Sequence, residues 1–398
     1  MKVTTDPILR MDFDKRNDFL ELSSFAPAVC FQCGTCTATC PWSELLDTPM
    51  TVRKMIHKAL LGLDTDPMLW FCTTCRMCET RCPREVDIVK SLLAMRKMAF
   101  RKRQVPAEFE QLLWNVLEEG NPMGDPLSAR ANWASDLNLR DASKGVDVLL
   151  YTGCASSYDP RIQKVARSLA AILGSTGMDF GILGTKELCC GDSVRSTGED
   201  AFMETLIEKN VEAFSATGAS RIVTISPHCY DMFNGLYKEY GMEIEILHHT
   251  ELIAELWNNG ALNMSQDIRG KGGPERIVTY HDPCYLGRYH GIYDAPRGLL
   301  EGIKGLQCTE MADCRENALC CGGGGGRMWL ETEPGARQSD LRIGQATRTG
   351  ADTMVTACPY CIQNFEDSTK VLESNIRVMD IAEIVAEASG VSPRGDAK

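Results

Sequence analysis

The sequence lacks long apolar runs and has no excess of positive charge. No stretch reaches the roughly 18 consecutive apolar residues of a membrane-spanning helix, and the N-terminus has no apolar segment of the kind a signal peptide carries. The 54 Asp and Glu residues outnumber the 42 Lys and Arg residues, so the formal net charge is −12. An acidic chain is a poor partner for nucleic acid. We therefore expect a cytoplasmic protein, which a partner protein could hold at the inner face of the membrane.

Cysteine is the residue that stands out, with 19 in 398 residues. The count is odd and the chain is much longer than disulfide scaffolds, so full pairing within the chain is impossible. In a reducing compartment, many cysteines indicate metal ligands before disulfides. Eight of them lie between residues 30 and 82 and eleven between 154 and 361, with none over 83–145.

The chain divides into a helical part and an alternating part. Residues 1–110 are expected to form a helical domain, and 111–145 become polar with Gly and Pro, which favours a linker. From residue 146, apolar strand-like runs alternate with amphipathic helical patterns, which predicts α/β domains with mainly parallel sheets. We expect the first over 146–262 and the second over 276–398.

The α/β region contains one pattern twice. The offset is 130, 131 and 132 residues for the pairs Cys154 and Cys284, Cys189 and Cys320, and Cys229 and Cys361. The segments 243–257 and 375–389 also resemble each other. A repeat of this length has the size of a domain, so the sequence predicts two tandem α/β domains related by internal duplication.

Two copies of one cysteine motif occupy the N-terminal domain. Each has the spacing C-x2-C-x2-C-x3-C-P, which is typical of paired [4Fe–4S] clusters. The fourth cysteine of such a motif usually ligates the other cluster. We therefore expect one cubane on Cys30, Cys33, Cys36 and Cys82, and a second on Cys72, Cys75, Cys78 and Cys40. Zinc is disfavoured because structural zinc sites typically use paired C-x2-C motifs with longer gaps.

The second α/β domain carries five cysteines in the pattern C-x35-CC-x36-C-x2-C, which are Cys284, Cys320, Cys321, Cys358 and Cys361. Five thiolates exceed what a tetrahedral zinc ion or an ordinary cubane uses, so the pattern favours an unusual iron–sulfur cluster. The glycines at 322–326 would let the backbone splay adjacent cysteines and approach their sulfurs. Because ligands gather beyond the carboxyl ends of parallel strands, we expect Cys284 and Cys358 at strand ends.

The first α/β domain has an incomplete version of this motif, with Cys154, Cys189, Cys190 and Cys229. Ser226 stands where the second domain has Cys358. Four thiolates could bind a cubane, an altered cluster, a zinc ion or nothing. His228 is a candidate substitute ligand, although a packed or surface histidine is the more common case.

These motifs resemble the CCG-domain family, the cysteine-rich repeats of heterodisulfide reductases. CFQCGTCTATCP and LWFCTTCRMCETRCP are similar to the C subunit of these enzymes, whereas YHDPCYLGR and CCGGGGGRMW are similar to the B subunit. A fusion of the two resembles the D subunit. The resemblance implies a noncubane [4Fe–4S] cluster on the five cysteines of the second repeat. The B subunit holds two such clusters facing one another, with disulfide cleavage between them, and Ser226 breaks that pattern here.

Three functions follow as hypotheses. The first is an iron–sulfur subunit that passes electrons between a partner and the noncubane cluster, with the cysteines of the second repeat as the reactive site. No flavin or nucleotide fingerprint is present, so the partner would be a flavoprotein like that of heterodisulfide reductase (its A subunit), an electron-transfer flavoprotein or a membrane cytochrome b. The second is a self-sufficient disulfide reductase. The third is a structural metal scaffold for complex assembly.

Polar residues around Cys284 are weaker candidates. His281, Arg288 and His290 could relay protons or hold an anionic substrate, although hydrogen bonding within the loop is favoured. Cys308 and Cys314 fall outside both motifs and are interpreted as packed free thiols.

Overall fold

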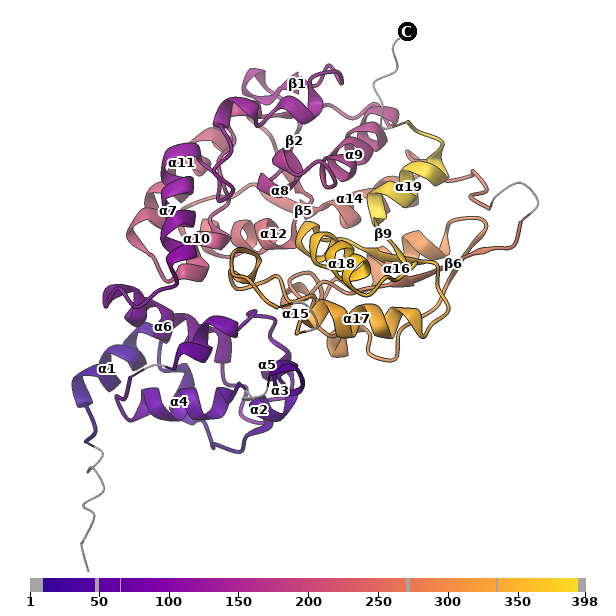
Figure 1. The fold of residues 1–398 in the computed structure, drawn as a ribbon. Coiled ribbons are helices and arrows are strands. Elements are labelled where there is room, and N and C mark those ends of the chain that lie inside the picture. The colour runs from indigo at the N-terminus through magenta and orange to yellow at the C-terminus, as the bar shows by residue number, and fades with distance from the viewer. Residues whose placement is uncertain (1–9, 47–49, 65, 270–272, 334–335, 393–398) are drawn as a thin grey trace, which may run out of the picture.

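The computed structural model describes residues 10–46, 50–64, 66–269, 273–333 and 336–392 of the chain. A helical N-terminal domain lies against two α/β domains (Figure 1). Across the residues that the structure describes, no helix is both long enough and apolar enough to cross a membrane.

Three helices frame the N-terminal domain, α1 (Phe13–Leu22), α4 (Val52–Leu60) and α6 (Ile88–Arg101). Carboxylates cap two of them, because Asp12 accepts a hydrogen bond from the Lys15 amide and Asp87 accepts one from the Lys90 amide. The cysteine motifs form loops with short helices, which are α2 (Thr35–Thr39), α3 (Trp42–Leu45) and α5 (Met77–Thr80). Six of the eight cysteines in these motifs pack against the helical core.

The linker that the sequence predicts over 111–145 contains ordered structure. Helix α7 (Ala107–Glu119) runs across the expected boundary, and its Phe109, Leu112 and Val116 are buried in the core of the first α/β domain. Further along, β1 (Arg140–Asp141) pairs with β3 at the edge of the first sheet. The segment thus belongs in part to the first α/β domain, because its apolar helix face needs that core.

The first α/β domain has a five-stranded parallel sheet in the order β1-β3-β2-β4-β5. Its main strands are β2 (Val148–Tyr151), β3 (Phe180–Ile182), β4 (Arg221–Thr224) and β5 (Glu245–His248). Its helices are α8 (Cys154–Tyr158), α9 (Gln163–Ser175), α10 (Asp192–Thr197), α11 (Ala201–Ser215), α12 (Pro227–Asn234), α13 (Leu236–Glu239) and α14 (His249–Asn258). The predicted alternation of strands and helices is confirmed here.

The second α/β domain repeats this arrangement. Its parallel sheet has the order β7-β6-β8-β9, with β6 (Arg276–Tyr280), β7 (Leu306–Cys308), β8 (Thr353–Thr356) and β9 (Arg377–Asp380). Its helices are α15 (Gly287–His290), α16 (Asp294–Glu301), α17 (Gln338–Thr347), α18 (Pro359–Val371) and α19 (Ile381–Ser389). The order matches β3-β2-β4-β5 of the first sheet strand for strand.

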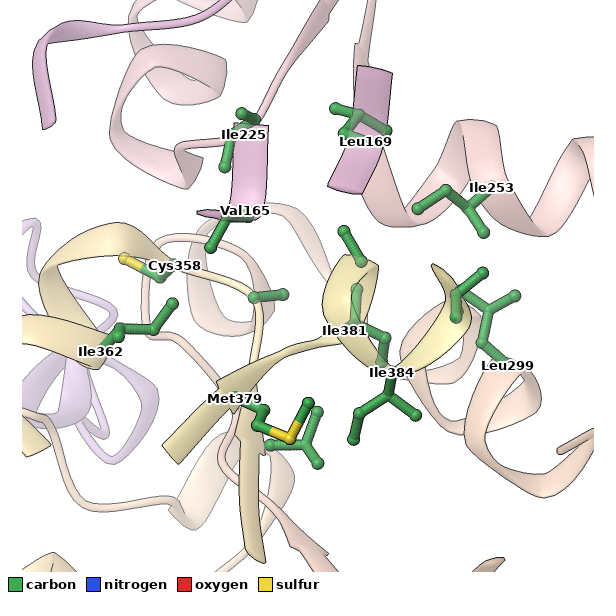
Figure 2. Packing of buried hydrophobic residues seen from close by; sticks show 14 of the residues in the cluster. Val165, Leu169, Ile225, Ile253, Leu299, Cys358, Ile362, Met379, Ile381 and Ile384 are labelled. Carbon is green, nitrogen blue, oxygen red and sulfur yellow. The ribbon is translucent and has the colours of Figure 1, made fainter. Parts of the chain in front are cut away.

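One hydrophobic core joins the two α/β domains. Helix α9 of the first domain lies beside α19 of the second (Figure 1). Figure 2 shows Val165 and Leu169 of α9 above Ile381 and Ile384 of α19, and all four side chains are buried. Burying such side chains stabilises the contact by roughly 1.5–3 kcal/mol each. The two domains therefore form one unit that fixes their cysteine sites relative to each other.

Candidate metal centres

One small cavity is lined by four cysteines from both N-terminal motifs, Cys30, Cys33, Cys36 and Cys82. Cys82 belongs to the second motif. It reaches this cavity because it follows α5, which packs against α2 of the first motif. The backbone amide and the side-chain amide of Gln32 both donate to the Cys30 sulfur at 3.4 Å. Gln32 has a φ of 58°, so the loop turns its amide toward the sulfur.

A second small cavity is lined by the other four cysteines, Cys40, Cys72, Cys75 and Cys78. The Thr74 amide donates to the Cys72 sulfur at 3.4 Å. Burial raises the pKa of the Cys72 thiol to about 11, although Arg96 and the Thr74 amide oppose the rise. A buried thiol is costly to ionise, whereas an iron–sulfur cluster binds its cysteines as thiolates. The donor set therefore fits such a cluster.

The five cysteines of the second α/β domain converge at the carboxyl ends of two neighbouring strands. Cys284 follows β6, and Cys358 caps the N-terminus of α18 directly after β8, so strand order brings them together. The Cys284 and Cys320 sulfurs are 4.0 Å apart. Cys361 interacts with both Cys321 and Cys358, which links all five side chains into one buried group.

The surroundings favour the thiolate form of three cysteines in this group, Cys320, Cys321 and Cys358, whereas a hydrogen bond to Cys320 raises the pKa of Cys284 and burial raises that of Cys361. Hydrogen bonds from Cys320 and Cys361 lower the pKa of Cys321 to about 5 against the effect of burial. Burial raises the pKa of Cys358, but hydrogen bonds from Cys361 and His228 outweigh it and bring that pKa to about 5. The Gly322 amide also donates to the Cys320 sulfur at 3.3 Å. These donors fit a metal cluster, which needs its cysteines deprotonated.

The glycine run lies against the loop of the second N-terminal motif. A Cβ at Gly324 would stand 2.4 Å from the Thr73 carbonyl oxygen, and one at Gly325 would stand 2.4 Å from that of Cys72. Only glycine allows these two backbones to approach so closely. The run therefore brings the domains together, in addition to supporting cysteine sulfurs as the sequence predicts.

Two candidate centres adjoin through Cys75 and Cys320. Cys75 of the N-terminal domain packs against the buried core that contains Cys284 and Cys320 of the second α/β domain, and Cys320 raises the pKa of the Cys75 thiol. Residues next to Cys284 hold the contact: Arg288 donates to the Cys75 carbonyl oxygen at 2.5 Å, and the Tyr285 hydroxyl lies 2.7 Å from that of Thr74. The second cavity and the five-cysteine group thus share a wall.

The incomplete motif of the first α/β domain also converges. Cys154 begins α8 after β2, and its thiol interacts with Cys189, which in turn contacts Cys190 and, through it, Cys229. Ser226 interacts with Cys229. Across the described residues, no three or more His, Cys, Asp or Glu side chains are grouped as the ligands of a single metal ion.

Arg130, a buried residue outside all the sequence motifs, lies next to the first cysteine of this site. Both terminal nitrogens of Arg130 lie 3.6 Å from the Cys154 sulfur, and one donates to Glu187 at 2.8 Å. Glu187 also accepts hydrogen bonds from the amides of Thr152 and Gly153, at 2.9 and 2.8 Å. Both side chains of the Arg130–Glu187 ion pair are buried, and the pair holds the guanidinium beside Cys154.

His228 points away from the cysteines of its own domain. Its Nδ1 lies 3.0 Å from the carboxylate of Asp192, and its ring stacks on Tyr285 with centroids 3.9 Å apart. The ring interacts with Cys358 of the second domain. The structure thus places His228 beside the five-cysteine group and not where a substitute ligand for Ser226 would stand.

Of the three polar residues around Cys284, His281 hydrogen-bonds within its own domain, whereas Arg288 and His290 bond to other domains. Buried His281 accepts a hydrogen bond of 3.1 Å from the Arg342 guanidinium, while Arg288 holds the Cys75 loop. His290 lies 3.2 Å from Asp231 of the first α/β domain. Cys308 and Cys314 are half-buried, and Cys308 packs against the core that joins the two α/β domains.

Two family models match the chain. A 4Fe-4S dicluster domain matches residues 27–86. A cysteine-rich domain, CCG, matches twice, over 148–234 and 278–366. These matches show that the chain is of an iron–sulfur type, with a dicluster domain followed by two CCG regions.

Curated relatives agree with these matches. The chain is 35% identical over 345 residues to the probable iron-sulfur-binding oxidoreductase FadF of Bacillus subtilis, covering 83% of this chain and 48% of that protein. It is 34% identical over 354 residues to the EtfAB:quinone oxidoreductase of Syntrophomonas wolfei, covering 85% and 49%. The chain thus spans about half the length of these two relatives.

A third relative matches over most of its length. The chain is 32% identical over 334 residues to the D subunit of the dihydromethanophenazine:CoB–CoM heterodisulfide reductase of Methanosarcina barkeri, covering 81% of this chain and 78% of that protein. The predicted resemblance is confirmed. The chain belongs to the family of heterodisulfide reductase D subunits, whose members join a 4Fe-4S dicluster domain to cysteine-rich CCG domains.

Proposed function

We propose that this chain is an electron-transfer subunit of a heterodisulfide reductase-like complex. Each N-terminal cavity would hold one cubane [4Fe–4S] cluster on its four cysteines, with the fourth ligand supplied by the other motif. The five-cysteine group would hold a noncubane [4Fe–4S] cluster. The iron–sulfur clusters supply one-electron redox chemistry.

The observation that carries this proposal is the packing of Cys75 against the core that contains Cys284 and Cys320. It makes the second cubane site and the noncubane site immediate neighbours, while the Cys30 cavity lies further out. Cys33 and Phe31, at this outer cavity, are exposed, and Phe31 is 69% exposed. Electrons can therefore enter or leave at this end and reach the noncubane site through the second cubane.

The partner would be a flavoprotein or a membrane cytochrome b. This chain carries no flavin or nucleotide fingerprint. One relative is named as an oxidoreductase between EtfAB and quinone, which supports a flavoprotein on one side and a quinone-linked component on the other. Purification with native partners distinguishes these: a flavoprotein in the complex indicates flavin-linked transfer, and a cytochrome b indicates quinone coupling.

A second candidate is disulfide or thiol reduction at the noncubane site. A cavity of about 1600 Å³, counting its open mouth, reaches Cys321 from the surface, which favours access by a small molecule. The first domain has no fifth cysteine, because Ser226 replaces it, so one such cluster would act alone. The equal strand orders and the two CCG matches also support the proposal that the two domains arose by duplication.

Anaerobic purification followed by iron analysis and EPR tests the assignment. Two cubanes and one noncubane cluster require about 12 irons per chain, with four in each cluster, and a noncubane EPR signal. About eight irons without that signal would favour a scaffold role for the CCG domains. Thiol release from a disulfide by the purified chain would favour the reductase.

A further inference from the structure

The cavity at Cys321 contains polar groups that no part of the described protein satisfies. Its walls come from the glycine run, α17, α18 and Trp42 of the N-terminal domain. Both amide atoms of Gln338, the Nε of Arg327 and the indole nitrogen of Trp42 are buried and lack hydrogen-bond partners among the described residues. Buried polar atoms of native proteins rarely lack partners, so these groups point to a ligand.

Arg327 is the most informative of these residues. Arg327 is only 7% exposed. In the described part of the chain, its side chain donates hydrogen bonds to the backbone carbonyl oxygen of Glu331 and to the hydroxyl of Thr332, and neither acceptor is charged. Its guanidinium lies 5.7 Å from the ring centre of Trp42 and 4.9 Å from that of Phe71. Aromatic faces attract a cation but do not replace the water that it loses on burial.

Gln338 and Trp42 form the wall between two cavities. Both line the cavity at Cys321 and the cavity of Cys40 and its partners, whereas Arg327 lines only the first. Cluster sulfurs would therefore be within reach of Gln338 and Trp42, but the Arg327 guanidinium belongs to the open cavity alone. The side chains of Met328 and Trp329 add apolar surface around it.

We propose that this cavity binds a small organic anion. The carboxylate of this anion, or an equivalent group, would accept hydrogen bonds from the Arg327 guanidinium and from the Gln338 amide. The apolar part of the anion would pack against Met328 and Trp329. Guanidinium groups bind such anions with charge-assisted hydrogen bonds. The anion would stand next to Cys321, so this site deepens the proposed function and rests on it for a cluster at Cys321.

Calorimetric titration of the anaerobically purified holoprotein with benzoate and benzamide tests the site. The two probes share size and shape and differ in charge. We expect benzoate to bind at least tenfold more tightly than benzamide. Equal binding of both, or binding of neither, would overturn the proposal.

Substitutions in the cavity test which side chain binds the anion. Arg327→Gln should abolish the preference for benzoate, and Arg327→Lys should keep part of it. Arg337→Gln is the matched control, because Arg337 lies at the same cavity but pairs with Asp367 at 3.8 Å, and it should keep the full preference. Iron content verifies that each variant is intact. Should Arg327→Gln lose iron, Gln338→Leu takes its place and should weaken benzoate binding more than benzamide binding.

The outcome is separable from that of the proposed function. EPR of the ligand-free protein reports whether the noncubane cluster is present. Calorimetry reports whether the anion binds. A benzoate preference that survives in Arg327→Gln with unchanged iron content would refute the assignment to Arg327, whatever the cluster type.

Discussion

Arg96 of α6 donates a hydrogen bond of 2.7 Å to the carbonyl oxygen of Gly325, 229 residues further along the chain. The same buried guanidinium donates to the carbonyl oxygens of Ser196, at 2.9 Å, and Cys72, at 2.8 Å. One side chain therefore joins the N-terminal domain to both α/β domains. Because Cys72 lines the second cubane cavity, this contact also positions the cavity against the glycine run.

Arg96→Met should loosen this three-way junction. The substitution keeps the side-chain volume roughly but leaves several buried carbonyl groups without donors, so we expect a loss of about 3 kcal/mol in the free energy of unfolding. Urea unfolding of the holoprotein measures it. Arg101→Met is the control on the same helix, since Arg101 pairs with Asp18 at the surface and should contribute less than about 1 kcal/mol. Equal effects of both variants would contradict the role of Arg96.

Gly324→Ala should separate the second cubane from the five-cysteine group. The new Cβ would stand 2.4 Å from the Thr73 carbonyl oxygen, so the backbones must move apart. Overpacking of this kind typically costs about 1–3 kcal/mol. Magnetic coupling between the two clusters, seen as broadening or splitting in EPR, should weaken. Gly298→Ala is the control, because its Cβ meets nothing within 4 Å in α16, and unchanged coupling in both variants would count against the shared wall.

Cys82→Ala should remove the first cubane and leave the second. Cys82 belongs to the second motif by sequence, but its side chain lines the cavity of Cys30, Cys33 and Cys36. About four irons should be lost, and Cys40→Ala should remove the second cubane instead. Mössbauer or EPR spectra of the two variants distinguish the clusters. Cys308→Ala should retain all iron, and loss of the second cubane in Cys82→Ala would disprove the crossed ligation.

Phe31→Ala should slow electron exchange with a protein partner without affecting the clusters. Phe31 lies between two ligands of the outer cavity, and Arg84 stacks over its ring at 4.4 Å. Exposed aromatic side chains often anchor protein contacts, so we expect the rate with the native partner to fall about tenfold. Reduction by a small dye should stay unchanged. Trp114→Ala, at another exposed position on α7, is the control, and an equal slowing there would argue against docking at Phe31.

Local spacing allowed much of this protein to be predicted from its sequence. The C-x2-C-x2-C-x3-C-P motifs predicted the two groups of four cysteines that the structure gathers around its two cavities. The alternation of apolar runs and amphipathic segments predicted the parallel α/β sheets. Both features depend on residues close in the chain, so periodicity and motif spacing are sufficient to detect them.

The sequence did not reveal the residues that bring the sites together. Arg96 and Arg130 stand in ordinary helical or polar segments, and nothing in their local context distinguishes them from surface arginines, whereas Arg327 follows the glycine run but was given no role from the sequence. His228 was a candidate ligand for its own domain, yet the fold turns its ring toward Cys358. The linker predicted over 111–145 contains a helix whose apolar face belongs to a core formed by later residues.

The sequence by itself determined which cysteines are grouped and which fold carries them. Tertiary structure alone decided that Cys75 meets Cys320, that Arg96 reaches Gly325, and that an open cavity ends at Cys321. The physical reason is the range of the interactions. Spacing and periodicity follow from local backbone geometry, whereas the hydrogen bond from Arg96 to Gly325 joins residues 229 positions apart, and only the packing of the three domains brings such residues together.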